Sequence, residues 1–218
     1  MALHNDHFGR IAEKALCIAR GIPFVGPYPN DLIGPAEALA VRFGCFVPHM
    51  PGDWTHTAAR GARYDYSNEE EHRSLKTNTR DWKVCPQVIG QTTKQRWCTY
   101  FGLPANTPDT EIKQFIQSNL LRVLDEAHTH TFDTTIFHYH KPSNTARVIT
   151  SRGLPNWSAK NLTFTKNGDA WKESSTLKAN GKTIGEFQIH NHRNNVKFRW
   201  NLKNLIEAFP EAFDVTLV

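Results

Sequence analysis

The chain has 218 residues, of which 39% are hydrophobic and 11% aromatic, and its formal net charge at pH 7 is +5. This composition supplies enough apolar side chains for a packed core and excludes wholesale disorder. No apolar run of about 18 residues occurs, and Glu13 and Lys14 interrupt the early apolar stretch, so we expect neither a membrane span nor a signal peptide. The four cysteines form no Cys-x-x-Cys pair, which favours reduced thiols in a cytoplasmic protein.

The N-terminal part predicts two helices and a strand. Residues 6–20 carry apolar side chains at helical spacing, with Asp6 as a cap at the start and Gly21 at the end. After a loop rich in Pro and Gly, a short helix is predicted from Pro35 to Phe43. The triplet Cys-Phe-Val at 45–47 predicts a strand.

A β-hairpin follows, with short strands at residues 63–66 and 72–78 joined by the polar turn Ser-Asn-Glu-Glu-Glu. Asp65 lies near the end of the first strand and Lys76 lies on the second. A carboxylate and an ammonium group that converge at one sheet edge can hold a divalent cation and an attacking water at a phosphodiester. Mg²⁺ needs few protein oxygens, so Asp65 and the backbone carbonyl of Leu75 are candidate ligands. Lys76 would orient or activate the water and offset charge in the transition state.

The remaining chain predicts helices followed by β structure. A helix or tight loop is expected between residues 84 and 101, and a helix capped by Thr107 carries an apolar face up to Leu124. From residue 128 onward, alternating polar and apolar residues predict strands. The expected later elements are Asn-Gly turns at 167–168 and 180–181, two strands within 183–200 around Asn194-Asn195, and a helix over about 201–209.

Asp65, eight intervening residues and then Ser74-Leu75-Lys76 resemble the PD-(D/E)XK nuclease pattern, in the variant whose second acid is a small polar residue. The sequence around these residues is similar to that of small type II restriction endonucleases, in the segments Ser-Leu-Lys-Thr-Asn and Lys-Val-Cys-Pro-Gln-Val-Ile-Gly-Gln. The resemblance covers about residues 6–101. It implies an α/β (α+β) fold with a central mixed sheet flanked by helices, which is restriction-endonuclease-like, and a β-rich basic C-terminal part that reads DNA.

The resemblance also implies site residues. Asp65 and Glu13, which stands on the first helix where the family often places a glutamate, would hold Mg²⁺, and Lys76 would assist the water. Ser74 occupies the place of the missing acid, which leaves Glu13 or the acids at 69–71 as the second carboxylate. Gln87 would contact the scissile phosphate or the water.

Two other interpretations of these acids stay open. Asp53 competes for the role of first acid, although it lies in a loop too far upstream to pair with Lys76. An exposed salt bridge, which contributes little to stability, is the alternative for Asp65 and Lys76.

The charge is unevenly distributed. Residues 141–204 hold twelve Lys and Arg against three Asp and Glu, a net +9, and the rest of the chain carries −4. Such an asymmetry indicates a polyanion-binding part. One hairpin crowds side chains that can pair with base edges in the major groove or with phosphates: Gln188, Asn191, Arg193, Asn194, Asn195, Lys197 and Arg199. An amide-rich turn with solvated charges is the alternative.

Four histidines are candidate ligands for a metal ion. His128 and His130, and then His138 and His140, repeat at a spacing of two, so each pair is expected on one strand face, and whether they bind zinc stays open. The triplet His190-Asn191-His192 spells HNH, but the HNH nuclease motif extends over tens of residues, so the triplet alone is no evidence for it.

The sequence therefore predicts a Mg²⁺-dependent, sequence-specific endonuclease of double-stranded DNA with type II restriction character. Residues 1–127 would form the nuclease core and 128–218 the DNA-recognition part. The resemblance implies 5′-phosphate and 3′-hydroxyl ends, a homodimer on a palindromic site or a monomer that nicks each strand in turn, a DNA methyltransferase as genetic partner, and a prokaryotic cytoplasmic location. The alternatives are a structure-specific repair or junction nuclease and a non-catalytic DNA-binding protein.

Overall fold

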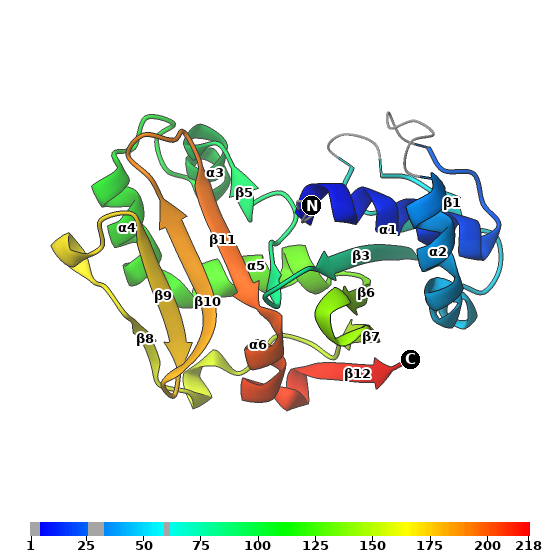
Figure 1. Cartoon of the computed structure of the whole chain (residues 1–218). Helices are drawn as coiled ribbons and strands as arrows, with labels where there is room; N and C mark the ends of the chain where they lie inside the picture. Colours follow the sequence, from blue (N-terminus) through cyan, green and yellow to red (C-terminus); the bar gives the residue numbers. More distant parts are fainter. Residues whose placement is uncertain (1–4, 26–32, 59–61) are drawn as a thin grey trace. The chain divides into compact units, whose positions relative to one another are not determined.

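The computed structural model describes residues 5–25, 33–58 and 62–218, with only the backbone for Asn5 and Asp6. The predicted cap by Asp6 therefore lies outside the described side chains. The chain forms two compact units (Figure 1), the first from residues 1–81, 134–151 and 214–218 and the second from 82–133 and 152–213. The boundary expected after residue 127 falls within helix α5, and each unit is assembled from separate chain segments.

The first unit contains a mixed six-stranded sheet. Its order is β1-β2-β3-β6-β7-β12, in which β3 and β6 are parallel while β2–β3 and β6–β7 are antiparallel. The predicted fold class, a mixed sheet flanked by helices, is confirmed. The strands are β1 (Thr55–His56), β2 (Tyr66–Ser67), β3 (His72–Asn78), β6 (Thr135–His140), β7 (Thr145–Ser151) and β12 (Phe213–Leu217).

Helices α1 (Asn5–Arg20) and α2 (Ile33–Phe43) belong to the same unit and form its core with the sheet. The buried face of α1 includes Phe8, Ile11 and Leu16, which lie in one apolar cluster with Leu75 of β3 and Phe137 of β6. The spacing of these helix residues is the helical periodicity seen in the sequence. Packing of α1 on the sheet brings the helix that carries Glu13 to the hairpin.

The strand predicted at 45–47 is wrong. These residues lie in the 3-10 helix η2 (Gly44–His49), which directly continues α2 and contains Pro48. Phe46 is fully buried, and its ring stacks on that of Phe137 at a centroid distance of 4.8 Å. Tertiary packing of this aromatic side chain overrides a local β preference, and Pro48 has no N–H for a strand ladder.

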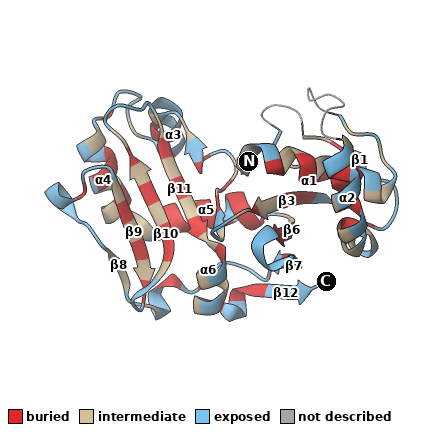
Figure 2. Ribbon diagram, viewed as in Figure 1, coloured by how far each residue is buried: buried red, intermediate tan, exposed pale blue. Residues whose placement is uncertain are grey.

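The second unit contains an antiparallel sheet of order β4-β11-β10-β9-β8, with β5 pairing to β11. Buried and half-buried residues alternate along β9, β10 and β11 (Figure 2), so one face of the sheet packs on the core and the other is polar. The strands are β4 (Lys83–Val84), β5 (Gln91–Thr92), β8 (Leu162–Phe164), β9 (Ser174–Ala179), β10 (Lys182–Ile189) and β11 (Val196–Asn201).

The helices of the second unit are α3 (Lys94–Phe101), α4 (Asp109–Ser118), α5 (Leu120–Phe132) and α6 (Leu202–Ala208). The core contains Trp157, which stacks on Trp200 at 5.9 Å between ring centroids, and the Trp200 indole donates to Thr131 on α5. Trp171 is also buried, so the tryptophans serve packing. The hairpin of β10 and β11 and the final helix agree with the sequence prediction.

The helix predicted up to Leu124 is instead two helices. Asn119 separates α4 from α5, since both its backbone N–H and its side-chain amide donate to the Phe115 carbonyl. The predicted start of β structure at residue 128 is also wrong, because α5 continues to Phe132 with a buried face that includes His128 and Phe132, but the predicted strands do follow from Thr135 onward.

The turns have distinct geometries. Asn180 and Gly181 both have positive φ, 47° and 81°, the backbone of a type I′ turn that joins β9 to β10 as predicted. Asn167 precedes the 3-10 helix η5 (Gly168–Ala170) in a longer connection between β8 and β9. Within the described residues, no helix has the length and apolar character needed to cross a bilayer.

We expect Leu16→Ala to lower the free energy of unfolding by about 2–5 kcal/mol, because it opens a cavity where a fully buried side chain packs. Leu217→Ala is the matched control in the same unit, since Leu217 is 69% exposed and surface substitutions change stability by about 0.5 kcal/mol or less. Urea unfolding followed by circular dichroism measures both. Equal losses in the two variants would contradict this core.

Candidate active site

The hairpin of β2 and β3 has a well-defined register. Tyr66 lies opposite Arg73 and Ser67 opposite His72. The Asn68 side chain closes the turn, because its Oδ1 accepts from the backbone N–H groups of Glu70 at 2.9 Å and Glu71 at 2.6 Å. The polar turn thereby fixes which residues of the two strands face one another.

Asp65 directly precedes β2, an interior strand between β1 and β3, so the first strand begins at Tyr66 and not at residue 63 as predicted. Its backbone N–H donates to the Arg73 carbonyl at 3.1 Å, and its carbonyl accepts from the Thr57 N–H at 2.9 Å. Its carboxylate Oδ2 accepts from the backbone N–H of Leu75 at 2.7 Å. The N–H and C=O of an extended residue point to the same side of the strand. The Leu75 carbonyl therefore lies on the strand edge that the Asp65 carboxylate occupies.

Lys76 and Ser74 lie on the other face of β3 from Leu75, because side chains alternate along a strand. Lys76 interacts electrostatically with Asp65 and acts to lower the pKa of that carboxyl. Ser74 is 1% exposed, and within the described residues its hydroxyl has no hydrogen-bond partner. The structure thus brings the predicted aspartate and lysine together and places Ser74 on the same strand face as the lysine.

Glu13 joins this group from helix α1. The Tyr66 hydroxyl donates to the Glu13 backbone carbonyl at 2.7 Å, which ties the helix to the hairpin. The Glu13 side chain is close enough to Asp65 to act on the pKa of that carboxyl as a like charge. Glu71, by contrast, forms an ion pair with Arg73 at 2.7 Å. The geometry favours Glu13 over the turn acids as the second carboxylate. Asp53 is an exposed loop residue.

His56 on β1 is a member of the cluster that the sequence did not predict. Its Nδ1 accepts from the Val25 N–H at 3.0 Å, so the neutral ring carries its proton on Nε2. Nε2 lies 3.7 Å from the Glu13 carboxylate, and the ring is buried between Phe24 and Tyr66. No local motif marks this histidine, because only the pairing of β1 with β2 brings it to the site.

Burial raises the pKa of Asp65 above its usual range, Lys76 opposes the rise and Glu13 adds to it. Loss of solvation disfavours the carboxylate, and a second negative charge disfavours it further. Since the folded-state pKa exceeds the unfolded-state pKa, this group stabilises the fold fully below the unfolded-state pKa. That contribution is lost as the pH rises through the folded-state pKa. A bound cation would favour the charged form.

The predicted DNA-reading side chains lie in the second unit. Gln188 pairs with Lys197 and Glu186 with Arg199 on the polar face of β10 and β11. Arg199 Nη2 lies 2.8 Å from Glu186. Partial burial opposes ionisation of Glu186, but hydrogen bonds and charges, including those of Arg199, lower its pKa overall. The other four predicted residues occupy the turn between the strands: Asn191, Arg193, Asn194 and Asn195.

Gln87 also belongs to the second unit, where its backbone N–H donates to the His130 carbonyl at 2.8 Å. Its predicted contact with the scissile phosphate or the water stays a prediction.

The expectation that His128 and His130 share a strand face is wrong, because both lie on helix α5. Burial lowers the pKa of His128 to about 4. His138 and His140 do lie on strand β6, where His138 Nε2 is 2.8 Å from the Asn78 side chain and His140 Nδ1 is 2.7 Å from Ser143. Among the described residues, the three potential ligands that do converge are different ones: Glu173, His190 and His192.

A mixed sheet with an acid directly before one strand and a lysine on the neighbouring strand is the architecture expected for a restriction-endonuclease-like chain. The chain is 37% identical over 220 aligned positions to the type II restriction enzyme CviAII of Paramecium bursaria Chlorella virus 1. The alignment covers 99% of this chain and 64% of that relative. No protein-family model and no solved structure matches the chain. The relative confirms the resemblance to type II restriction enzymes and extends it beyond residue 101.

We expect Lys76→Met to raise the pKa of Asp65 further and Glu13→Gln to lower it, since the two native side chains act on this carboxyl with opposite signs. The carboxyl ¹³C shift of Asp65, followed by NMR through a pH titration, measures the midpoint. Glu70→Gln, in the exposed turn, serves as the control. Midpoints that do not move apart in the two variants would contradict the electrostatic coupling.

Proposed function

We propose that the chain is a Mg²⁺-dependent, sequence-specific endonuclease of double-stranded DNA with type II restriction character. The main observation is the Asp65 carboxylate, which accepts from the Leu75 N–H at 2.7 Å and interacts with Lys76 and Glu13. Similarity to a type II restriction enzyme over 99% of the chain supports the same activity. The chain spans 64% of that relative's length, so its activity is carried over as part of this proposal.

The donors at the hairpin suit a hard cation. The Asp65 and Glu13 carboxylates and the Leu75 carbonyl are oxygen ligands, which Mg²⁺ prefers, and Mg²⁺ retains several waters of its own. Burial raises the pKa of Asp65, Lys76 opposes the rise and Glu13 adds to it, and a bound cation would favour the charged carboxylate. When bound, Mg²⁺ would polarise the phosphate and lower the pKa of a water.

Lys76 acts on the reacting groups. Its ammonium group orients the attacking water and offsets the negative charge that develops on the phosphorus centre. Attack at phosphorus breaks the bond to the 3′ oxygen and leaves 5′-phosphate and 3′-hydroxyl ends. Ser74 occupies the position of the acid in the family pattern, and its hydroxyl would bind the cation through a water or not at all.

DNA recognition is assigned to the second unit. The polar face of β10 and β11 and the turn at 191–195 present amides and cations suited to base edges and phosphates. A homodimer on a palindromic site, a DNA methyltransferase as genetic partner and a prokaryotic cytoplasmic location stay predictions of the family resemblance.

Two other functions fit the same fold. A repair or junction nuclease would cut by DNA shape, and the concentration of amides near β10 and β11 argues against it, since such side chains read bases. A non-catalytic DNA-binding protein would leave the acid cluster of the first unit without a role.

Plasmid digestion with Mg²⁺ tests the proposal. Discrete fragments are expected from the wild type, whereas Asp65→Asn and Lys76→Ala should each cut at least about 100-fold more slowly, because the first removes a metal ligand and the second removes a positive charge at the phosphate. Glu70→Gln, an exposed acid of the same hairpin, should cut at the wild-type rate. An intact plasmid would support the non-catalytic alternative, and a smear would exclude sequence-specific cleavage.

Arg193→Ala should reduce discrimination between cognate and unrelated DNA by about 1–3 kcal/mol, as loss of a bidentate base contact does. Lys178→Ala, on the polar face of β9, should weaken binding to both DNAs equally as a phosphate contact does. Binding measured without Mg²⁺ compares the two variants in the absence of cleavage. Equal weakening on both DNAs by Arg193→Ala would reassign this arginine to phosphate.

A further inference from the structure

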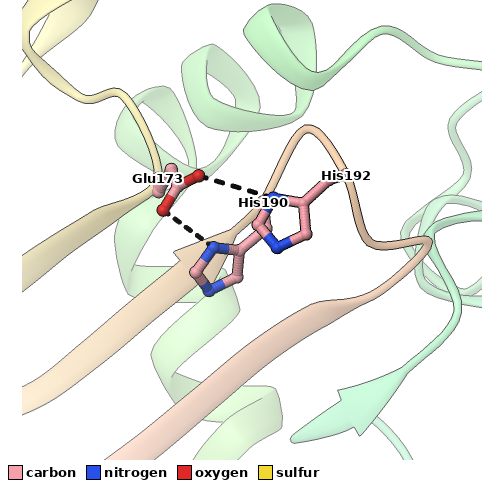
Figure 3. A group of neighbouring side chains, drawn as sticks. All are labelled: Glu173, His190 and His192. Atoms are coloured by element: carbon pink, nitrogen blue, oxygen red, sulfur yellow. Dashed lines mark ion pairs between the residues drawn. The ribbon is translucent and has the colours of Figure 1, made fainter.

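We propose that Glu173, His190 and His192 form a binding site for a transition-metal ion, with Zn²⁺ as the best fit. The three side chains converge in the second unit (Figure 3), where one ring nitrogen of each histidine faces the same carboxylate. Their ligand atoms all lie within 4.8 Å of one another. These residues are neither predicted Mg²⁺ ligands nor predicted DNA-reading side chains, although His192 lies within the turn at 191–195.

The distances match those between ligands of one metal ion. His190 Nδ1 is 3.0 Å from one Glu173 oxygen, and His192 Nδ1 is 3.6 Å from the other. Zinc bonds to nitrogen and oxygen of about 2.0–2.2 Å at tetrahedral angles place neighbouring ligand atoms about 3.3–3.5 Å apart. The observed pair of distances brackets that value, so small side-chain rotations are enough to enclose an ion.

Backbone contacts fix the site. The Ile189 N–H donates to the Glu173 carbonyl at 2.7 Å, which holds the residue before β9 against the end of β10. The carbonyl of His190 accepts from the Arg193 N–H at 3.2 Å and from the Lys94 ammonium at 3.1 Å. Two of the three ligands therefore belong to anchored backbone, which lowers the entropy cost of assembling the site.

The His190 nitrogen that faces the Glu173 carboxylate makes no hydrogen bond within the described residues. It is buried and lies 3.0 Å from Glu173. Buried polar atoms are nearly always satisfied by a donor, an acceptor or an ion. A cation that accepts the ring lone pair would satisfy this nitrogen and the carboxylate together.

The ligand set selects the kind of ion. Two imidazoles and one carboxylate suit Zn²⁺ and neighbouring transition metals, whereas Mg²⁺ prefers oxygen ligands. Three protein ligands leave a fourth position for water. His192 is 63% exposed at the side chain, so an ion can enter from solvent. Binding would join the segment before β9 to the turn after β10 and would stabilise the folded state.

The test uses the full chain after treatment with a chelator. Titration with ZnCl₂ should show one ion per chain, a higher melting temperature, and slower amide hydrogen exchange in the turn at 190–195. His192→Ala and Glu173→Gln should each weaken Zn²⁺ binding at least tenfold. Both replaced side chains are about half exposed or more, so the variants should keep the fold.

The controls separate this site from other binding. His7→Ala removes an exposed imidazole of the first unit and should keep one Zn²⁺ per chain. Mg²⁺ should affect wild type and Glu173→Gln alike, because its predicted ligands are Asp65 and Glu13. A wild-type chain that binds no Zn²⁺, or variants at His192 and Glu173 that keep wild-type affinity, would overturn the proposal whether or not the protein cleaves DNA.

Discussion

The hydrogen bond from the Leu75 amide to the Asp65 carboxylate is the constraint on which the candidate active site depends. Strand β2 has two residues and β3 has seven, so β3 extends beyond β2 at the end where Asp65 lies. A side-chain oxygen of Asp65 takes the amide that a backbone carbonyl would accept in a longer ladder. This contact places the Asp65 carboxylate on the side of β3 where the Leu75 carbonyl lies, at the point where the pairing of β2 with β3 ends.

The electrostatic cost of keeping the Asp65 carboxylate charged is also what gives the site an affinity for a cation. Burial and the nearby Glu13 raise the pKa of Asp65, and Lys76 only partly offsets the rise. A site that is costly to keep negatively charged has a corresponding affinity for a cation that supplies the missing compensation. The contribution of Asp65 to the stability of the fold is lost as the pH rises, and active sites often tolerate such a loss because the same groups are needed for function.

Local sequence patterns predict the hairpin, whereas His56 and the helical state of residues 128–132 depend on long-range contacts. The hairpin was predictable because a polar turn separates two β-prone runs, and the acid–lysine spacing follows from that register. His56 was not predictable, because only strand pairing brings it to Glu13. Histidine and threonine repeat at a spacing of two over residues 128–131, as they could on a strand, yet buried His128 and Phe132 belong to a helix. Such short alternations are ambiguous until the packing partner is known.

The position of β3 within its sheet fixes the backbone that carries Lys76. β3 is an interior strand, antiparallel to β2 and parallel to β6, with Lys76 opposite His138. Parallel neighbours need a long connection, and here residues 82–133, with α3, α4 and α5, lie between β3 and β6. The chain therefore passes through the second unit between the two strands that pair in parallel here. Side chains on interior strands are positioned more exactly than side chains on loops, and this suits a lysine that must act on a single phosphate.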